Sequence, residues 1–201
     1  MADLVNTRLL RDLSDEALVF RLGETGDRSS FGIIYERYQR RVLSRAVRIV
    51  GDPVEAQDLS QEVFLKLFRN AAKYKQQSAF AAWFKVMTYN VVIDELRKTQ
   101  RIRLVPLPED DRMLPVLTDS ENAIREKRMF EMLSERLMQL LELVSEEEKL
   151  MLLMKYRDDI PVKTIARTFA LGESAVKMRL RRGRLKVLEL DRSMASLDPT
   201  E

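Results

Sequence analysis

The chain has 201 residues, of which 45% are hydrophobic and 33% are charged, and its formal net charge is only +3. This length suits one domain or two small ones, and the apolar fraction is enough for real cores. Cysteine and histidine are both absent, which excludes disulfides, Cys/His zinc sites and a histidine general base. The N-terminal stretch is charged throughout and has no apolar signal core, so we expect a cytoplasmic protein without membrane insertion.

The first half of the chain is predicted to form helices separated by short turns. Ser14, followed by two acids, is typical of an N-cap, and its helix is expected to end near Gly23. A second helix over about 30–50 carries apolar residues at helical spacing. Gly-Asp-Pro at 51–53 then predicts the cap and the first position of a third helix that runs to about Asn70.

A change in composition divides the chain. Residues 71–79 are polar and lose periodicity, which predicts a loop, and a fourth helix is expected over about 80–101. Prolines and acids are then concentrated in 104–122, as is typical of a linker. We therefore expect an all-α protein with an N-terminal helical domain (12–102), an acidic linker (103–122) and a C-terminal helical domain (123–191).

The second half is predicted to end in a helix-turn-helix. After a helix over about 123–144, Ser145 and the glutamates that follow it indicate a capping box that opens the next helix. Pro161 opens a short helix, residues 170–172 form a turn, and a long basic helix follows. Two helices joined by a tight turn, the second one basic, are typical of a DNA-binding helix-turn-helix.

The last helix carries two different faces. Its apolar stripe consists of Val176, Leu180, Gly183 and Val187. Its basic stripe consists of Lys177, Arg181 and Arg184, flanked by Arg179 and Arg182. Such a surface can bind phosphate or guanine edges, and a second basic cluster at 97–103 indicates a second contact point for a polyanion. The plainer alternative is a solvated face whose cations complement the helix dipole.

Four blocks of the sequence together resemble the extracytoplasmic-function (ECF) sigma factors of bacterial RNA polymerase, which belong to the sigma-70 family. The blocks begin with DEALVFRLGETGD, AQDLSQEVFLKLF, AFAAWFKVMTYN and EEEKLMLLMKYRDD, and the resemblance covers nearly the whole chain. It implies an alternative sigma factor that binds the polymerase core and reads −35 duplex and melted −10 DNA. It also implies a protein that is not an enzyme and needs no cofactor.

By this resemblance, the third helix docks on the basic clamp helices of the largest polymerase subunit. The implied contact residues are Asp58, Gln61, Glu62 and Leu65. The alternative for this surface is a solvated helix face with pairs such as Glu62 with Lys66. Glu55, Asp58 and Glu62 share part of one helix side, but a single helix without a facing acid does not predict a metal site.

The loop over 71–79 and the helix after it match the element that reads the −10 region. In the family a base is extruded there into a pocket, where an aromatic wall can offset the lost stacking. The residues implied to bind −10 DNA are Tyr74, Lys75, Gln76, Gln77, Asn90, Arg97, Lys98 and Arg101. The alternative for Tyr74 is a loop residue that closes the core. Trp83 and Phe84 are expected in the core rather than against bases.

The helix-turn-helix matches the −35 reader of the family. The residues implied to face the DNA groove are Ser174, Lys177, Met178, Arg181 and Arg182, and those implied to meet phosphate are Arg179 and Arg184. The family pattern has glycine where this chain has Ala170, and Ser or Thr where it has Gly172. A left-handed Ala170 would cost about 1 kcal/mol relative to glycine. The turn geometry therefore bears on the register of the base contacts.

The implied partners are RNA polymerase core, promoter DNA and an anti-sigma factor. On the polymerase, the implied surfaces are the clamp helices of the largest subunit and the flap of the second. The acidic linker is implied to thread toward the active-site channel, and its alternative is a solvated spacer. Two other functions remain open: a free-standing helix-turn-helix regulator whose N-terminal domain senses or dimerises, and a protein-binding adaptor that mimics a sigma factor.

Overall fold

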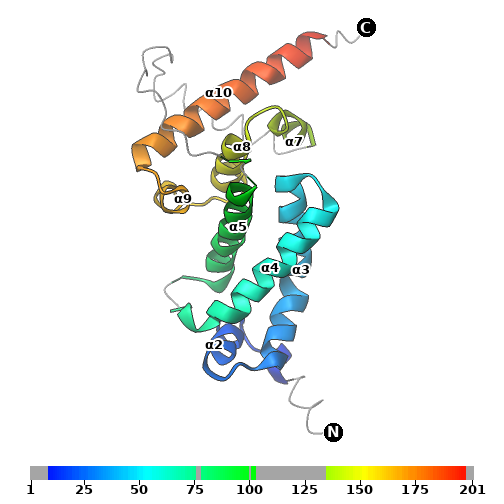
Figure 1. The fold of residues 1–201 in the computed structure, drawn as a ribbon, viewed down its shortest axis with the longest axis vertical. Coiled ribbons are helices and arrows are strands. Elements are labelled where there is room, and N and C mark those ends of the chain that lie inside the picture. Colours follow the sequence, from blue (N-terminus) through cyan, green and yellow to red (C-terminus); the bar gives the residue numbers. More distant parts are fainter. Residues whose placement is uncertain (1–8, 76–77, 100, 103–134, 198–201) are drawn as a thin grey trace. The chain divides into compact units, whose positions relative to one another are not determined.

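The structure is a computed structural model that describes residues 9–75, 78–99, 101–102 and 135–197. Within these ranges every regular element is a helix, which confirms the all-α prediction (Figure 1). The chain divides into two units, Met1–Lys98 and Thr99–Glu201. None of the described helices combines the length and the apolar content that a membrane span requires.

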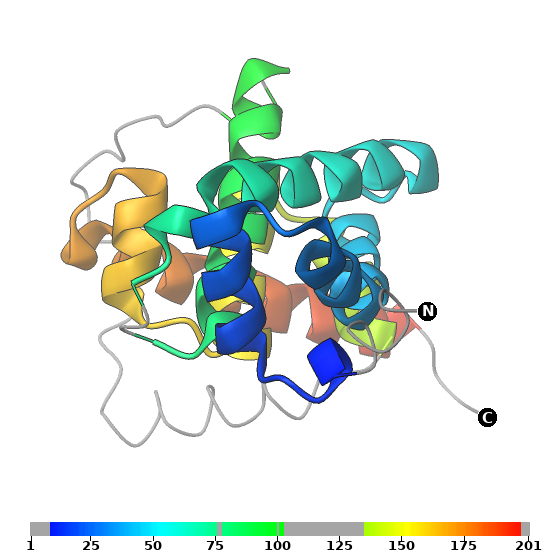
Figure 2. The same cartoon turned by 90° about the horizontal axis from the view of Figure 1, so that it is seen from below.

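The first unit contains α2 (Asp15–Thr25), α3 (Arg28–Val50), α4 (Pro53–Asn70), the short 3-10 helix η1 (Ala71–Lys73) and α5 (Phe80–Lys98). In this unit α3 packs against both α2 and α4, and α4 packs against α5 (Figure 2). Helix α2 also packs against η1, the turn that follows α4. The end of α5 at Lys98 comes before the predicted end at 101.

The starts of α2 and α4 follow the predicted caps. The Ser14 hydroxyl accepts a hydrogen bond from the Ala17 N–H at 3.2 Å. The Asp52 carboxylate accepts from the N–H groups of Val54 and Glu55, both at 2.8 Å, and Pro53 occupies the first helical position. These side chains supply partners for N–H groups that have none inside the helix.

Two boundaries at the turn between α2 and α3 also differ from the prediction. Helix α2 continues past Gly23 to Thr25 and is capped by Gly26, whose φ of 66° is the left-handed conformation that glycine adopts without strain. Helix α3 begins at Arg28, before the predicted Ser30, because the Asp27 carboxylate caps it. Both differences arise because the turn is built by the Gly26-Asp27 pair, so the helices on either side extend up to it.

An aromatic cluster forms the core of the first unit. The ring of Phe80 stacks on that of Phe84, with centroids 5.3 Å apart and planes 13° apart. The Tyr38 ring meets both of them edge-on at 5.4 Å, and Phe64 lies 5.6 Å from Phe84. Such ring pairs contribute about 0.5–1.5 kcal/mol each beyond the area they bury. The cluster therefore holds α3, α4 and α5 together.

The second unit contains α7 (Glu135–Leu141), α8 (Glu146–Leu152), the π-helical segment η3 (Leu153–Arg157), α9 (Val162–Phe169) and α10 (Glu173–Leu197). The predicted capping box at Ser145 is confirmed, because its hydroxyl accepts from the Glu148 N–H at 3.3 Å and its own N–H donates to the Glu148 carboxylate at 3.1 Å. Helix α10 packs against α7, α8 and α9. The buried residues that make this core include Leu150, Ile165, Phe169, Val176 and Val187.

Part of the predicted second half lies outside the described residues. Of the helix expected over 123–144, the structure describes α7 (Glu135–Leu141). The expected linker over 103–122 falls entirely outside the described ranges, so the predicted domain boundaries stay a prediction.

Candidate functional site

The outward face of α4 is acidic and partly apolar. All four residues predicted there, Asp58, Gln61, Glu62 and Leu65, are exposed. The opposite side of the helix holds the buried Leu59, Val63 and Leu67. Leu65 is 49% exposed although it is a leucine on a well-packed helix. A partly apolar surface beside carboxylates suits contact with another protein that carries positive charge.

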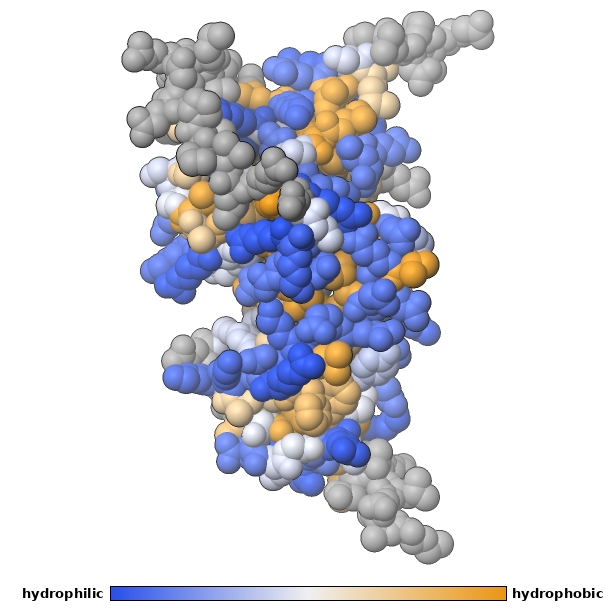
Figure 3. All heavy atoms as spheres, viewed as in Figure 1, coloured by the Kyte–Doolittle hydropathy of each residue, from blue (hydrophilic) through white to orange (hydrophobic). Residues whose placement is uncertain are grey.

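Three exposed apolar side chains beside this face were missed by the sequence analysis. Val54 and Phe68 are exposed on α4, and Tyr35 is exposed on α3. The Phe31 ring joins them, because it lies 5.4 Å from the Phe68 ring and 6.4 Å from the Tyr35 ring. Helical spacing from Leu65 would have found Phe68, whereas Tyr35 depends on how α3 packs on α4. Figure 3 shows scattered apolar patches, in orange, on a mainly hydrophilic face.

The charged side chains of α4 form other pairs than the Glu62–Lys66 pair expected for a solvated helix face. Lys66 donates to the Asp94 carboxylate of α5 at 3.1 Å instead of pairing with Glu62. Glu62 lies 3.7 Å from the Arg69 guanidinium, and both side chains are at least half exposed. An exposed pair of this kind contributes little to stability, so Glu62 is available to a partner at small cost.

The predicted −10 loop is organised around Tyr74, which is buried rather than displayed. Only 6% of Tyr74 is exposed, and its hydroxyl donates to the Ser78 carbonyl at 2.5 Å. The ring lies 5.3 Å from Trp83 and 5.9 Å from Phe80. This placement supports the alternative in which Tyr74 closes the core. Lys75 is exposed, and Gln76 and Gln77 lie outside the described residues.

Helix α5 and the residues just after it carry the rest of the predicted −10 surface. Asn90 is half-buried, and Lys98 and Arg101 are exposed. Lys98 pairs with Glu95 at 2.9 Å, and this bond and the Glu95 charge raise the pKa of the Lys98 ammonium. Arg97 lies 3.9 Å from Asp94. As predicted, Phe84 is in the core, whereas Trp83 is only half-buried.

The turn between α9 and α10 has the left-handed residue that the sequence singled out. Ala170 has φ 56° and ψ 42°. The Leu171 N–H donates to the Ala166 carbonyl at 2.9 Å, and the Ala170 N–H donates to the Arg167 carbonyl at 3.2 Å. This pair of bonds is a Schellman motif, which normally has glycine at the left-handed position. The turn thus keeps its usual geometry, and Ala170 bears the strain.

The outward side of α10 carries most of the predicted −35 surface. Ser174 and Lys177 are exposed, and Met178, Arg181 and Arg182 are half-buried. The opposite side is formed by Val176, Leu180, Gly183 and Val187, all buried as predicted. Gly183 allows close packing, since a Cβ atom there would lie 3.3 Å from the Leu152 side chain.

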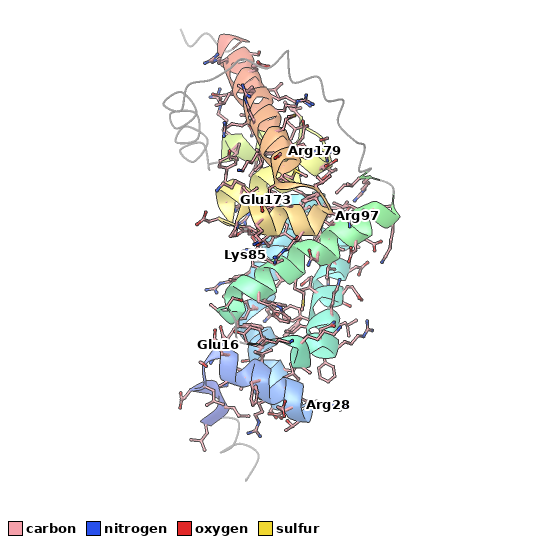
Figure 4. All side chains as sticks on the ribbon, turned by 90° about the vertical axis from the view of Figure 1, so that its left-hand side faces the viewer. Glu16, Arg28, Lys85, Arg97, Glu173 and Arg179 are labelled. Carbon is pink, nitrogen blue, oxygen red and sulfur yellow. The ribbon has the colours of Figure 1, made fainter. Side chains whose placement is uncertain are left out.

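Two of the predicted phosphate contacts are corrected by the structure. Arg179, labelled on α10 in Figure 4, is only 8% exposed. It forms an ion pair with Glu147 of α8. Arg184 is 4% exposed and donates to the Tyr156 hydroxyl at 2.6 Å. Burial lowers the pKa of Arg179, and the neighbouring Arg182 charge acts in the same direction. Both guanidinium groups therefore join α10 to the rest of its unit instead of facing solvent.

Comparisons with known families identify both halves of the chain. A family model described as Sigma-70 region 2 matches residues 34–102. A second model, described as Sigma-70, region 4, matches residues 134–187. The first match includes α4, the Tyr74 loop and α5, and the second includes α8, α9 and most of α10.

Individual relatives carry the same family name. The ECF RNA polymerase sigma factor SigE of Mycolicibacterium smegmatis is 35% identical over 94 residues, which is 45% of this chain and 36% of that protein. The RNA polymerase sigma-H factor of Pseudomonas aeruginosa is 34% identical over 88 residues, which is 44% of this chain and 45% of that protein. The chain thus spans less than half the length of these two relatives. The ECF RNA polymerase sigma-E factor of Escherichia coli is 28% identical over 178 residues, which is 86% of this chain and 91% of that protein.

Proposed function

Since the chain belongs to the ECF group of the sigma-70 family, we propose that it is an alternative sigma factor that binds RNA polymerase core and directs promoter-specific transcription initiation. The observation that carries this proposal is the presence of regions 2 and 4 in one chain, in that order, each lying almost entirely in its own unit. The chain contributes binding and positioning while the polymerase performs the chemistry, so it acts in the cytoplasm and is not itself an enzyme.

The outward face of α4 is the proposed surface for the polymerase clamp helices. Asp58, Gln61 and Glu62 supply polar and acidic groups, and Leu65 supplies an apolar centre. We add Phe68 and Tyr35, because their exposed rings extend the apolar centre. An anti-sigma factor that covers these rings would compete directly with the polymerase core. In this proposal, a basic partner pairs with the carboxylates while Leu65 and Phe68 become desolvated.

The first unit is also proposed to bind the melted −10 strand. The proposed contact residues are Lys75, Gln76, Gln77, Asn90, Arg97 and Lys98, together with Arg101, which follows the end of α5. Tyr74 acts from within, since its hydroxyl binds the Ser78 carbonyl and its ring packs against Trp83. The exposed cations near the end of α5 would hold strand phosphates and make this contact sensitive to salt.

The second unit is proposed to read the −35 duplex with α10. Ser174 and Lys177 lie in its first two turns, where side chains of a recognition helix reach base edges. Met178, Arg181 and Arg182 complete the contact surface. The flap of the second polymerase subunit is the proposed docking surface for this unit. Each unit alone reads a short element, and their joint binding to one polymerase makes the second contact effectively intramolecular.

Reconstituted transcription tests the function directly. Purified chain is added to core polymerase and a library of promoter templates, and run-off RNA is measured with and without the chain. We expect RNA that depends on the chain and starts at a defined subset of templates. The two alternatives give different results: a free-standing regulator binds its duplex tightly without polymerase, and a mimic supports no initiation at any template.

A further inference from the structure

Helix α2 contacts both flanks of the loop that follows η1. At the first flank, a Cβ atom on Gly23 would stand 2.8 Å from both the Cα and the N of Ala72. At the second flank, the Phe80 N–H donates to Oε1 of Glu16 at 2.9 Å (Figure 4 labels Glu16). Glu16 and Gly23 are in an i, i+7 relation, so they lie on the same side of α2. One helix side therefore holds the residues just before and just after the loop.

The bond from Phe80 to Glu16 has a clear physical basis. The first N–H groups of a helix have no partner inside it, and Phe80 is the first residue of α5. The Glu16 carboxylate provides the acceptor from a residue far away in the sequence. Its negative charge also lies at the positive end of the α5 dipole. Without Glu16, the start of α5 loses both this hydrogen bond and this charge.

The contact at Gly23 is steric. Backbone atoms of Ala72 occupy the space that any larger side chain at position 23 would need. Backbone cannot rotate away as a flexible side chain can, so a substitution must move η1 relative to α2. The two contacts thus act on opposite flanks and by different means, one by attraction and one by close packing.

Between the two flanks, Tyr74 connects Phe80 with Ser78, both in the described part of the loop region. Its ring contacts Phe80, the residue that Glu16 holds, and its hydroxyl binds the Ser78 carbonyl. Burial, with a smaller effect of the Glu16 charge, raises the pKa of the Tyr74 hydroxyl, so it keeps its proton and remains a donor. Tyr74, and through its hydroxyl bond Ser78, is therefore held at Phe80, the residue where α5 begins.

We propose that Glu16 and Gly23 are positioning residues that set the base selectivity of the −10 loop by fixing the separation of its flanks. This inference rests on the proposed −10 function and adds two residues from outside the element assigned to it. Phosphate contacts on α5 supply affinity for any sequence, whereas a base pocket depends on loop geometry. Disturbing the flanks should therefore reduce selectivity more than it reduces binding.

The experiment compares promoters that differ by single bases in the −10 element, using core polymerase and the full chain. The variants are Glu16→Ala, Glu16→Gln and Gly23→Ala. The matched control is Glu24→Ala, which removes the same charge from an exposed position on the same helix. We expect the preference for the best −10 base to fall about fivefold in Glu16→Ala, as the loss of one hydrogen bond allows. Gly23→Ala should act in the same direction, and Glu24→Ala should match the wild type.

Glu16→Gln separates positioning from a general loss of stability. Its amide oxygen still accepts the Phe80 N–H, so most of the selectivity should return even though the charge is gone. A second readout is the emission of Trp83, the only tryptophan, whose ring lies 5.3 Å from Tyr74. This emission should change in Glu16→Ala and Gly23→Ala but not in Glu24→Ala. If Glu16→Ala does not fold, Glu16→Asp takes its place.

Two results would overturn the inference without touching the proposed function. One is unchanged −10 selectivity in both Glu16→Ala and Gly23→Ala. The other is an equal loss of RNA from every −10 sequence together with a lower melting temperature, since that pattern means only a weakened fold. By contrast, a wild-type chain that supports no initiation contradicts the proposed function itself.

Discussion

The backbone of Ala170 is strained by an amount that a single substitution can release. An L-residue with a side chain at φ 56° is crowded by its own Cβ atom, and glycine at the left-handed position of a Schellman motif is not. We expect Ala170→Gly to raise the free energy of unfolding of the second unit by about 1 kcal/mol. Ala170→Val should lower it, because β-branching worsens the crowding. Urea unfolding of the two variants measures both effects, and equal stabilities would contradict the assigned turn.

Lys149 is a second residue whose environment gives a definite expectation. Its side chain is only 1% exposed, and its ammonium group lies 2.7 Å from the Glu142 carboxylate. Removing Glu142 leaves a buried charge without this partner, whereas removing Lys149 leaves a carboxylate that water can reach. We therefore expect Glu142→Gln to lower the free energy of unfolding by about 1–3 kcal/mol and Lys149→Met to change it much less. Chemical denaturation that ranks the two variants in the opposite order would contradict this account.

Single residues also show where prediction from sequence fails. Arg179 and Arg184 belong to the basic stretch of α10, and helical position alone does not say whether an arginine faces solvent or packs against a partner such as the half-buried Glu147 or the buried Tyr156. The sequence allowed two roles for Tyr74, a contact with −10 DNA and closure of the core. Its burial against Trp83 supports closure of the core. In each case the deciding partner comes from another element.

At the scale of elements, the cap at Asp27 makes the stability of α3 depend on pH. The Ser30 hydroxyl bond and the Arg21 charge lower the pKa of the Asp27 carboxyl. A carboxyl with a lowered pKa in the folded state stabilises the fold above its unfolded pKa, and this contribution is lost as pH falls through the folded value. We expect Asp27→Ala to cost about 1 kcal/mol near neutral pH and progressively less below about pH 4.

The matched variant for this test is Asp27→Asn, which still caps the helix but cannot ionise. Its stability should lie between those of the wild type and Asp27→Ala at neutral pH. Unfolding followed by circular dichroism from pH 7 to pH 2 gives the stability of wild type, Asp27→Ala and Asp27→Asn as a function of pH. A difference between wild type and Asp27→Ala that stays constant down to pH 2 would show that ionisation of Asp27 plays no part.

Helix starts were predictable because a cap is a local signal, read from Ser14, Asp52 and Ser145 within a few residues of the helix it begins. Contacts between distant elements were not. The bond from Phe80 to Glu16 and that from Lys66 to Asp94 depend on which helix packs against which. Exposure and burial were therefore predicted better on single helix faces, such as outward α4, than at the loop, where several elements meet.

At the scale of the whole molecule, the two units carry separate tasks, and this separation predicts two opposite defects. Lys177→Glu combined with Arg182→Glu should abolish −35 duplex binding and leave core binding intact. Glu62→Arg combined with Leu65→Ala should leave −35 duplex binding intact and weaken core binding about tenfold or more, as expected when residues at the centre of an interface are changed. Both double variants should fail to initiate at low protein concentration, because initiation needs both contacts at once.

Salt dependence distinguishes the two defects more sharply than affinity alone. Each phosphate contact that is lost lowers the slope of log K against log salt by about 0.9 for duplex DNA. Lys177 and Arg182 also bring positive charge into the groove and displace counterions there, so neutralising both to glutamine should flatten the slope of duplex binding. The same change at the buried Arg179 should weaken folding without a matching change in slope. Fluorescence anisotropy of a labelled −35 duplex at several salt concentrations measures the slope for each variant. If Arg179→Gln flattens the slope as much as Arg182→Gln, then Arg179 contacts DNA directly and its assignment to the interior is wrong.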